Sequence, residues 1–217
     1  MKLIVITILA FGLFACNNLT DKKSVENETT KDSLVYSDNS SIDKNDNETY
    51  NVDCNFDKFL KDPNTPKLAK DLLNNTAKKP TENEPLAYFE NFKSKDKQER
   101  EFYFKAVTNS YKIADGAYSE GLGYTGKEYI ENNPKEFAAF FANKNCFTDN
   151  DLEIWADILV LEFAIDNEGE YDKPIIDQFI NKLKSNCNDC SLTQKETIDK
   201  FGLTLNDKWK KYLKNTN

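Results

Sequence analysis

The fold is decided by residues 148–165, TDNDLEIWADILVLEFAI. The segment begins with Thr148, a good N-cap residue, and acids follow in the first turn, where the helix dipole favours negative charge. Asp151 stands three residues after Thr148, the spacing at which two side chains can cap a helix start together. From Ile154 to Ile165 apolar residues fall on almost every side of the helix. A helix of this kind is typical of a protein interior, so we expect it at the centre of a domain.

Helical patterns occur on both sides of this segment. Prolines and short polar stretches separate runs in which apolar residues recur every three or four positions. No run alternates convincingly in the way that paired strands require. We therefore expect an all-α domain with disulfides, either an irregular helical bundle or a short helical array, of about seven to nine helices. The other expected helices cover residues 66–77, 85–92, 97–114, 118–130, 135–143, 174–186, 193–201 and 205–214.

The composition excludes several kinds of chemistry. The chain has 217 residues, a formal net charge of −8 and no histidine. Without imidazole there is no Ser-His-Asp or Cys-His nucleophile and no histidine-ligated zinc or haem. An acidic chain without a run of basic residues repels phosphate backbones, so we expect no nucleic-acid partner. We also expect no cofactor, and any catalysis would depend on carboxylates, Lys, Tyr or Cys side chains.

The N-terminus has the features of an export signal. Lys2 makes the start positive, residues 3–14 are almost wholly apolar, and Cys16 follows the small residue Ala15. An apolar run of this length is too short to span about 30 Å of hydrocarbon, but it suits the core of a signal peptide. We expect residues 1–15 to be a signal peptide that is removed.

The end of this signal, Leu13-Phe14-Ala15-Cys16, resembles the lipobox of bacterial lipoproteins. The resemblance covers this segment alone. It implies that Cys16 receives a diacylglyceryl group, that the chain is cut before Cys16, and that the new amine is acylated. Several acyl chains give a stable membrane anchor. The resemblance therefore implies an extracytoplasmic protein of the bacterial cell envelope, held in a membrane by lipid and facing the periplasm or the surface.

The segment after Cys16 is polar. Residues 17–52 are rich in Asn, Asp, Ser, Thr, Lys and Glu, and their few apolar residues follow neither a helical nor a strand period. Such a segment cannot bury enough apolar surface to offset the entropy lost on ordering. We expect residues 16–52 to form a lipidated, disordered tether and residues 53–217 to form the helical domain.

Four cysteines remain in the expected domain: Cys54, Cys146, Cys187 and Cys190. An even number in an exported chain favours disulfides, with three connectivities open. The simplest one pairs Cys187 with Cys190 and Cys54 with Cys146. C-x-x-C spacing also occurs in redox pairs, but those follow a strand and begin a helix, whereas this one follows an expected helix. A zinc site of four thiolates is a further alternative, although it needs two close pairs of cysteines.

A glycine-rich stretch, Gly121-Leu122-Gly123-Tyr124-Thr125-Gly126, matches the G-x-G-x-x-G pattern of dinucleotide-binding turns. That pattern works only where a buried strand leads into the turn, and here a helical pattern precedes it. Each glycine within a helix costs about 1 kcal/mol, so it needs a packing or loop reason. We interpret the stretch as a close-packing surface, with Ala114, Ala117, Gly121 and Thr125 on one helical face.

Alternating acids form a candidate metal site. Asp166, Glu168, Glu170 and Asp172 lie between two expected helices. Alternating carboxylates can point at one hard cation such as calcium, although the glycine of this segment stands at the wrong offset for an EF-hand loop. The alternative is a solvated acidic loop.

Carboxylate pairs on the expected central helix are candidates for acid–base chemistry. Glu153 with Asp157, and Glu162 with Asp166, are each four residues apart. Proximity of like charges raises the pKa of one member of such a pair, as general acid catalysis requires. The alternative is that these acids simply line the wetted edge of the helix.

These observations lead to a ranked functional expectation. The leading interpretation is a membrane-tethered interaction module whose exposed aromatic or acidic face binds a protein or another component of the envelope, with a protein partner expected. An immunity or inhibitor protein fits within this class, because acidic faces suit cationic toxins. The alternative is a carboxylate-dependent hydrolase of envelope glycan, which needs two acids about 5–9.5 Å apart in a cleft. No motif singles out two such acids, so we assign no catalytic residue.

Overall fold

The computed structural model describes residues 54–78, 84–142, 146–167 and 174–216. All of them belong to one compact unit, which spans residues 48–217. The expected signal peptide, the lipidation site Cys16 and the tether lie outside the described residues.

Within the described ranges every regular element is helical, and no strand occurs. The all-α class is confirmed, and so are its disulfides, which join Cys54 to Cys146 and Cys187 to Cys190. The elements are α1 (Asp57–Lys61), α2 (Lys67–Leu73), η1 (Leu86–Lys93), α3 (Lys97–Ser110), η2 (Tyr111–Ile113), α4 (Gly116–Asn132), α5 (Pro134–Ala142), α6 (Asp149–Asp166), α7 (Ile175–Asn186) and α8 (Leu192–Thr216), where η marks a 3-10 helix.

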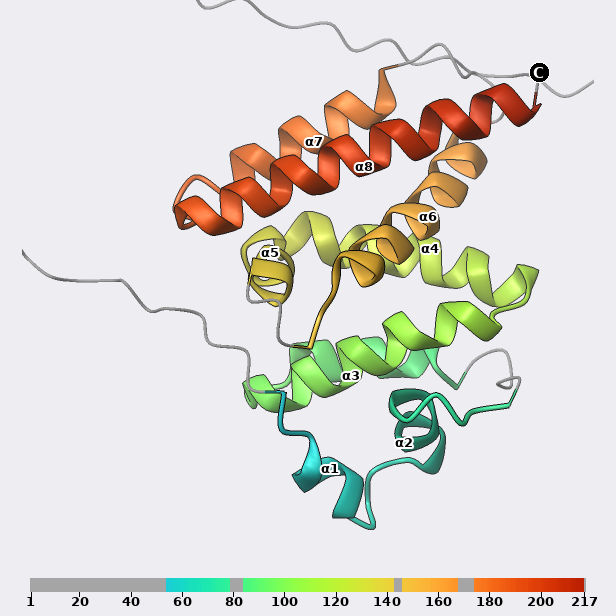
Figure 1. The fold of residues 1–217 in the computed structure, drawn as a ribbon, viewed down its shortest axis with the longest axis vertical. Coiled ribbons are helices and arrows are strands. Elements are labelled where there is room, and N and C mark those ends of the chain that lie inside the picture. Colours follow the sequence, from blue (N-terminus) through green and yellow to red (C-terminus); the bar gives the residue numbers. More distant parts are fainter. Residues whose placement is uncertain (1–53, 79–83, 143–145, 168–173, 217) are drawn as a thin grey trace, which may run out of the picture. The chain divides into compact units, whose positions relative to one another are not determined.

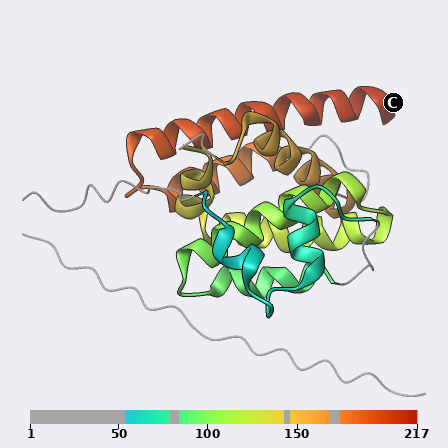
Figure 2. The same cartoon turned by 60° about the horizontal axis from the view of Figure 1, so that its bottom comes forward.

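The helices pack around α6. Helices α7 and α8 run side by side, and both α5 and α6 pack against α8 (Figure 1). Helix α4 packs against α6, while η1 and α2 pack against α3. Figure 2 shows α8 along the outer edge of the bundle. Helix α6 therefore has neighbours in α3, α4 and α8 and occupies the centre, as its sequence predicts.

The start of α6 is capped as expected. The hydroxyl of Thr148 accepts from the backbone N–H of Asp151 at 3.3 Å, and the Asp151 carboxylate accepts from the backbone N–H of Thr148 at 2.8 Å. Farther along α6, Trp155 is fully buried. Its ring stacks on Phe104 of α3 with centroids 4.9 Å apart, and its indole N–H donates to Thr108 at 2.9 Å. The capping box fixes where α6 begins, and Trp155 anchors it to α3.

Several of the expected helices differ in kind or extent. The one expected over residues 97–114 ends as an α-helix at Ser110 and is followed by the 3-10 helix η2. The helix expected over residues 85–92 is the 3-10 helix η1, whose geometry aligns residues three apart. Phe89 and Phe92 accordingly lie together, with ring centroids 4.7 Å apart. Helix α2 ends at Leu73 and not near residue 77. Asn75 adopts a left-handed conformation, with φ of 55°, and this reverses the chain.

The expected break between residues 201 and 205 is wrong, because α8 is one continuous helix through Gly202. A Cβ atom placed on Gly202 would lie 3.0 Å from Cδ1 of Ile180 in α7. Gly202 thus serves the close approach of α7 and α8 and does not end a helix.

The disulfide between Cys54 and Cys146 joins residues 92 positions apart. It links the start of the described domain to the segment just before α6. Cross-linking so long a loop restricts the unfolded chain and stabilises the fold by about 4.5 kcal/mol on chain-entropy grounds.

Candidate functional site

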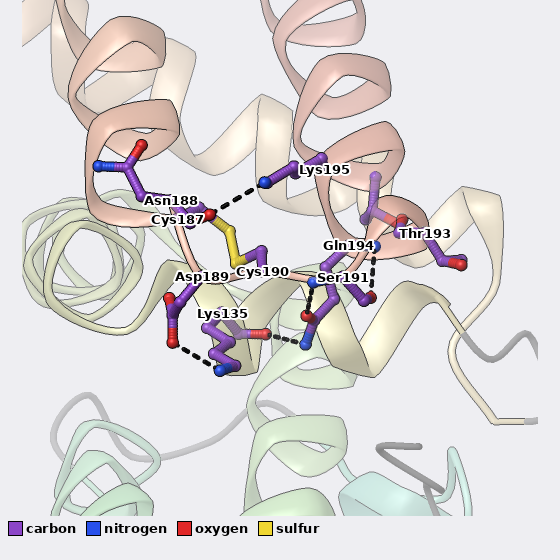
Figure 3. Close-up of a disulfide and its surroundings, with 10 residues drawn as sticks. Lys135, Cys187, Asn188, Asp189, Cys190, Ser191, Thr193, Gln194 and Lys195 are labelled. Atoms are coloured by element: carbon purple, nitrogen blue, oxygen red, sulfur yellow. Dashed lines mark hydrogen bonds and ion pairs between the residues drawn. A yellow bond between two sulfur atoms is a disulfide. The ribbon is translucent and has the colours of Figure 1, made fainter. Parts of the chain in front are cut away.

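The second disulfide closes the turn between α7 and α8 (Figure 3). Cys187 follows α7, as the sequence predicts, but Cys190 also stands just before α8. Ser191 and Gln194 cap α8 reciprocally: the Ser191 backbone N–H donates to the Gln194 side chain at 2.8 Å, and the Gln194 backbone N–H donates to the Ser191 hydroxyl at 3.3 Å. Both cysteines are buried. A buried disulfide in a helix–helix turn fits the structural interpretation better than the redox one.

A cavity of about 290 Å³ lies beside this disulfide. That volume is at the lower limit of ordinary ligand pockets. Asp199, the one carboxylate among its described lining residues, is paired with Lys184 at 2.7 Å. The described lining therefore does not supply the two convergent acids of a glycosidase. Its lining consists of Lys184, Cys187, Lys195, Ile198 and Asp199.

The first carboxylate pair on α6 fastens helices together. Lys208 of α8 lies 2.9 Å from Asp157 and 3.8 Å from Glu153, measured from its ammonium nitrogen to the carboxylate oxygens. One lysine thus bridges both acids and ties α8 to α6. This favours the interpretation of Glu153 and Asp157 as acids on the wetted edge of the helix.

Only one member of the candidate calcium segment belongs to the described residues. Asp166 accepts a hydrogen bond from the ammonium group of Lys127 on α4. Glu168, Glu170 and Asp172 lie outside the described residues. Among the residues that are described, no three acids, cysteines or histidines are grouped so that they could hold a metal ion.

The glycine-rich stretch lies inside α4 and forms no turn. A Cβ on Gly121 would meet Leu86 of η1 at 2.7 Å, and one on Gly126 would meet Trp155 of α6 at 2.7 Å. Close packing is thus the correct reason for these glycines. The predicted packing face, which also included Ala114, Ala117 and Thr125, is wrong. Ala117 is exposed, and Ala114 precedes α4 in extended conformation. The neighbours are side chains of η1 and α6, not another backbone.

Gly123 has an unusual neighbour, the carboxylate of Glu162 on α6. A Cβ on Gly123 would lie 2.8 Å from Glu162 Oε2 and 3.1 Å from Glu162 Cβ. Glu162 is only 4% exposed. Its carboxylate has no hydrogen-bond or ion-pair partner within the described part of the chain. Its oxygens are nevertheless not among the fully enclosed side-chain atoms that lack a hydrogen bond, so solvent still reaches the carboxylate.

Other charged groups surround Glu162. Burial raises the pKa of the Glu162 carboxyl, and the negative charges of Asp166 and Glu120 raise it further, while the positive charge of Lys127 lowers it. We call Glu120, Lys127, Glu162 and Asp166 the Glu162 cluster. It contains three carboxylates and a single ammonium group, and that ammonium group is bonded to Asp166. A buried carboxyl beside other acids is the environment in which functional carboxyls are found.

An exposed stripe on α4 shares Glu120 with this cluster. Glu120, Tyr124 and Glu128 follow one another at intervals of four residues and share one side of the helix. Tyr124 is 67% exposed, and both acids are exposed. Neither acid has an ion-pair partner among the residues that the structure describes. We call these three residues the α4 stripe.

Fold and site together define a disulfide-bonded helical domain with an acidic and aromatic surface on α4. No known protein family, no curated protein and no solved structure matches the chain. In the described ranges, no helix combines the length and the apolar character needed to cross a membrane.

Proposed function

We propose that the protein is a lipid-anchored lipoprotein of the bacterial cell envelope whose helical domain binds a cationic protein, in the manner of an immunity or inhibitor protein. The lipobox-like sequence ending at Cys16 supports the anchor and the location. The polar stretch over residues 17–52 supports a tether that lets the domain reach a partner.

The α4 stripe is the observation that carries the binding proposal. Tyrosine is enriched at the energetic centres of protein interfaces, because its ring offers a large contact area and loses little conformational entropy. Tyr124 stands exposed between two acids, Glu120 and Glu128, that lack a cation in the described structure. A partner with basic residues at the matching positions would bind the ring and neutralise both acids.

A carboxylate-dependent glycan hydrolase has less support. Lys208 bridges Glu153 and Asp157, so this pair already has a structural role. The second pair is unequal, because Glu162 is buried whereas Asp166 is exposed and bonded to Lys127. A hydrolase needs one protonated and one ionised carboxyl facing the same substrate.

Site-specific crosslinking in cells tests the binding proposal. A photo-crosslinking amino acid replaces Tyr124 in the full chain. The matched control places it at Leu203, which is 69% exposed on α8. We expect a discrete crosslinked product from position 124 only, which disappears when Glu120→Gln and Glu128→Gln are added. No product at position 124, the same products at position 203, or products unaffected by the two substitutions would each contradict the proposal.

A glycan-release assay tests the alternative directly. The purified full chain is incubated with envelope glycan, and soluble sugar fragments are measured. We expect no release above that of a heat-denatured sample. Release that disappears in Glu162→Gln would instead establish the hydrolase.

A further inference from the structure

Two unfavourable features meet at a single point between α4 and α6. Glycine weakens a helix interior, and Gly123 lies near the middle of α4. The position of Glu162 is unfavourable as well, because packing against α4 removes most of this side chain from water and no described group donates to its carboxylate. The absence of a side chain at Gly123 is what leaves room for the carboxylate. Neither residue is the one that stability alone would select at its position. Proteins keep such residues mainly at functional sites, so their combination points to a role in binding.

The charge of the Glu162 cluster indicates which ligand fits. Lys127 is the one cation among its three carboxylates, and its ammonium group is bonded to Asp166. The Lys127 ammonium also lies 5.4 Å from the centroid of the Phe163 ring, so it is held on the Asp166 side. Its positive charge acts on Glu162 from a distance, but neither Glu120 nor Glu162 forms an ion pair within the described structure. One additional positive group would halve their combined negative charge when both are ionised.

A small metal ion does not match the arrangement. Among the described residues, no three acidic side chains are close enough to coordinate one ion together. A guanidinium group is larger, planar and carries donors in a fork, so it can bond two separated carboxylates at once.

We propose that the Glu162 cluster binds one arginine side chain of a protein partner, with Glu162 and Glu120 accepting from the guanidinium. This inference rests on the proposed binding function and adds which side chain of the partner makes the central contact. Tyr124 stands one helical turn beyond Glu120 on the exposed side of α4. Its ring can cover the aliphatic part or the charge of the same arginine. Gly123 acts as a positioning residue, because a larger residue there would displace the Glu162 carboxylate.

Binding of a hexa-arginine peptide to the full chain tests the inference, by calorimetry at about 0.15 M salt, where weak surface attraction is screened. We expect Glu162→Gln to weaken binding about tenfold or more, since it removes a charge-assisted hydrogen bond. Glu196→Gln is the matched control, because Glu196 is an exposed acid on α8 and the substitution changes the net charge equally. An equal loss in both variants, or no loss in Glu162→Gln, would overturn the inference.

A second variant keeps the charge of the Glu162 carboxylate but displaces the carboxylate from its position. Gly123→Ala retains Glu162 but places a methyl group where its carboxylate lies, so we expect weaker peptide binding at unchanged net charge. Circular dichroism confirms that each variant is folded before binding is measured. Undiminished binding by folded Gly123→Ala would show that the position of the carboxylate is irrelevant, and would contradict the inference.

The two proposals fail in different ways. If crosslinking at position 124 depends on Glu120 and Glu128 but Glu162→Gln binds the peptide normally, the arginine site is wrong and the binding function stands. If position 124 yields no crosslink, the binding function itself fails, whatever the peptide result.

Discussion

Gly123 on α4 and Glu162 on α6 lie so close that a Cβ atom at position 123 would be 2.8 Å from Glu162 Oε2. The contact removes most of the Glu162 side chain from water where α4 crosses α6, and the charges of Glu120 and Asp166 act on its carboxylate there. Both residues lower the stability of the fold at these positions. Substituting either one should therefore change both the free energy of unfolding and the affinity for a partner.

Stability should depend on pH through Glu162. Its folded pKa is raised above the ordinary value of 4.5, so the folded state binds the proton more tightly than the unfolded state. Stability is therefore lost as pH rises from the unfolded pKa through the folded one. We expect Glu162→Gln to unfold at higher urea concentration than wild type at about pH 7, and the difference to shrink at about pH 4. A variant less stable than wild type at neutral pH would contradict this.

The packing of α4 on α6 should be sensitive to added volume at Gly126. A Cβ there would lie 2.7 Å from Cζ3 of Trp155, a rigid ring in the core. We expect Gly126→Ala to lower the free energy of unfolding by about 1–3 kcal/mol, as overpacking does. Gly116→Ala is the control, because nothing lies within 4 Å of its added methyl group. If both substitutions have the same effect in urea unfolding, packing at Trp155 is not the cause.

The two disulfides should differ in their contribution to stability. Replacing Cys54 and Cys146 by serine opens a loop with a sequence separation of 92, and we expect a loss of about 4.5 kcal/mol. Replacing Cys187 and Cys190 opens a separation of only 3, and we expect a loss of about 1.5 kcal/mol. Guanidinium unfolding of the two double variants measures the difference. A larger loss from the Cys187–Cys190 pair would mean that the turn does more than connect α7 and α8.

Lipid attachment should depend on Cys16 alone. We expect labelled palmitate to appear on the wild-type chain in cells and to be absent from Cys16→Ser, which should also keep its first fifteen residues. Mass spectrometry of the mature N-terminus supplies the second readout. A free Cys16 thiol on a protein that still carries its leader would refute the anchor.

Local patterns predicted a large part of this fold. The capping box at Thr148 and the apolar character of α6 depend on neighbouring residues only, so they could be recognised in the sequence. The prediction of a helix break at Gly202 was wrong because the role of this glycine depends on a residue far away in the sequence. Glycine is a weak helix former locally, but its role here is set by Ile180 on another helix.

The candidate site was only half visible in the sequence. Glu162 could be recognised as an acid paired with Asp166, and the cluster of glycines in α4 could be recognised as unusual. That the two features meet is a tertiary fact, because it requires α4 and α6 to cross at Gly123. A glutamate within the otherwise apolar stretch 158–165 was the signal that could have suggested its burial.

One joint measurement tests the central claim most directly: the urea midpoint and the hexa-arginine affinity of wild type, Glu162→Gln and Glu196→Gln in the same buffer. We predict that Glu162→Gln is more stable than wild type and binds the peptide more weakly, while Glu196→Gln changes neither appreciably. A Glu162→Gln protein that is less stable and binds as well as wild type would show that Glu162 serves the fold and not a partner.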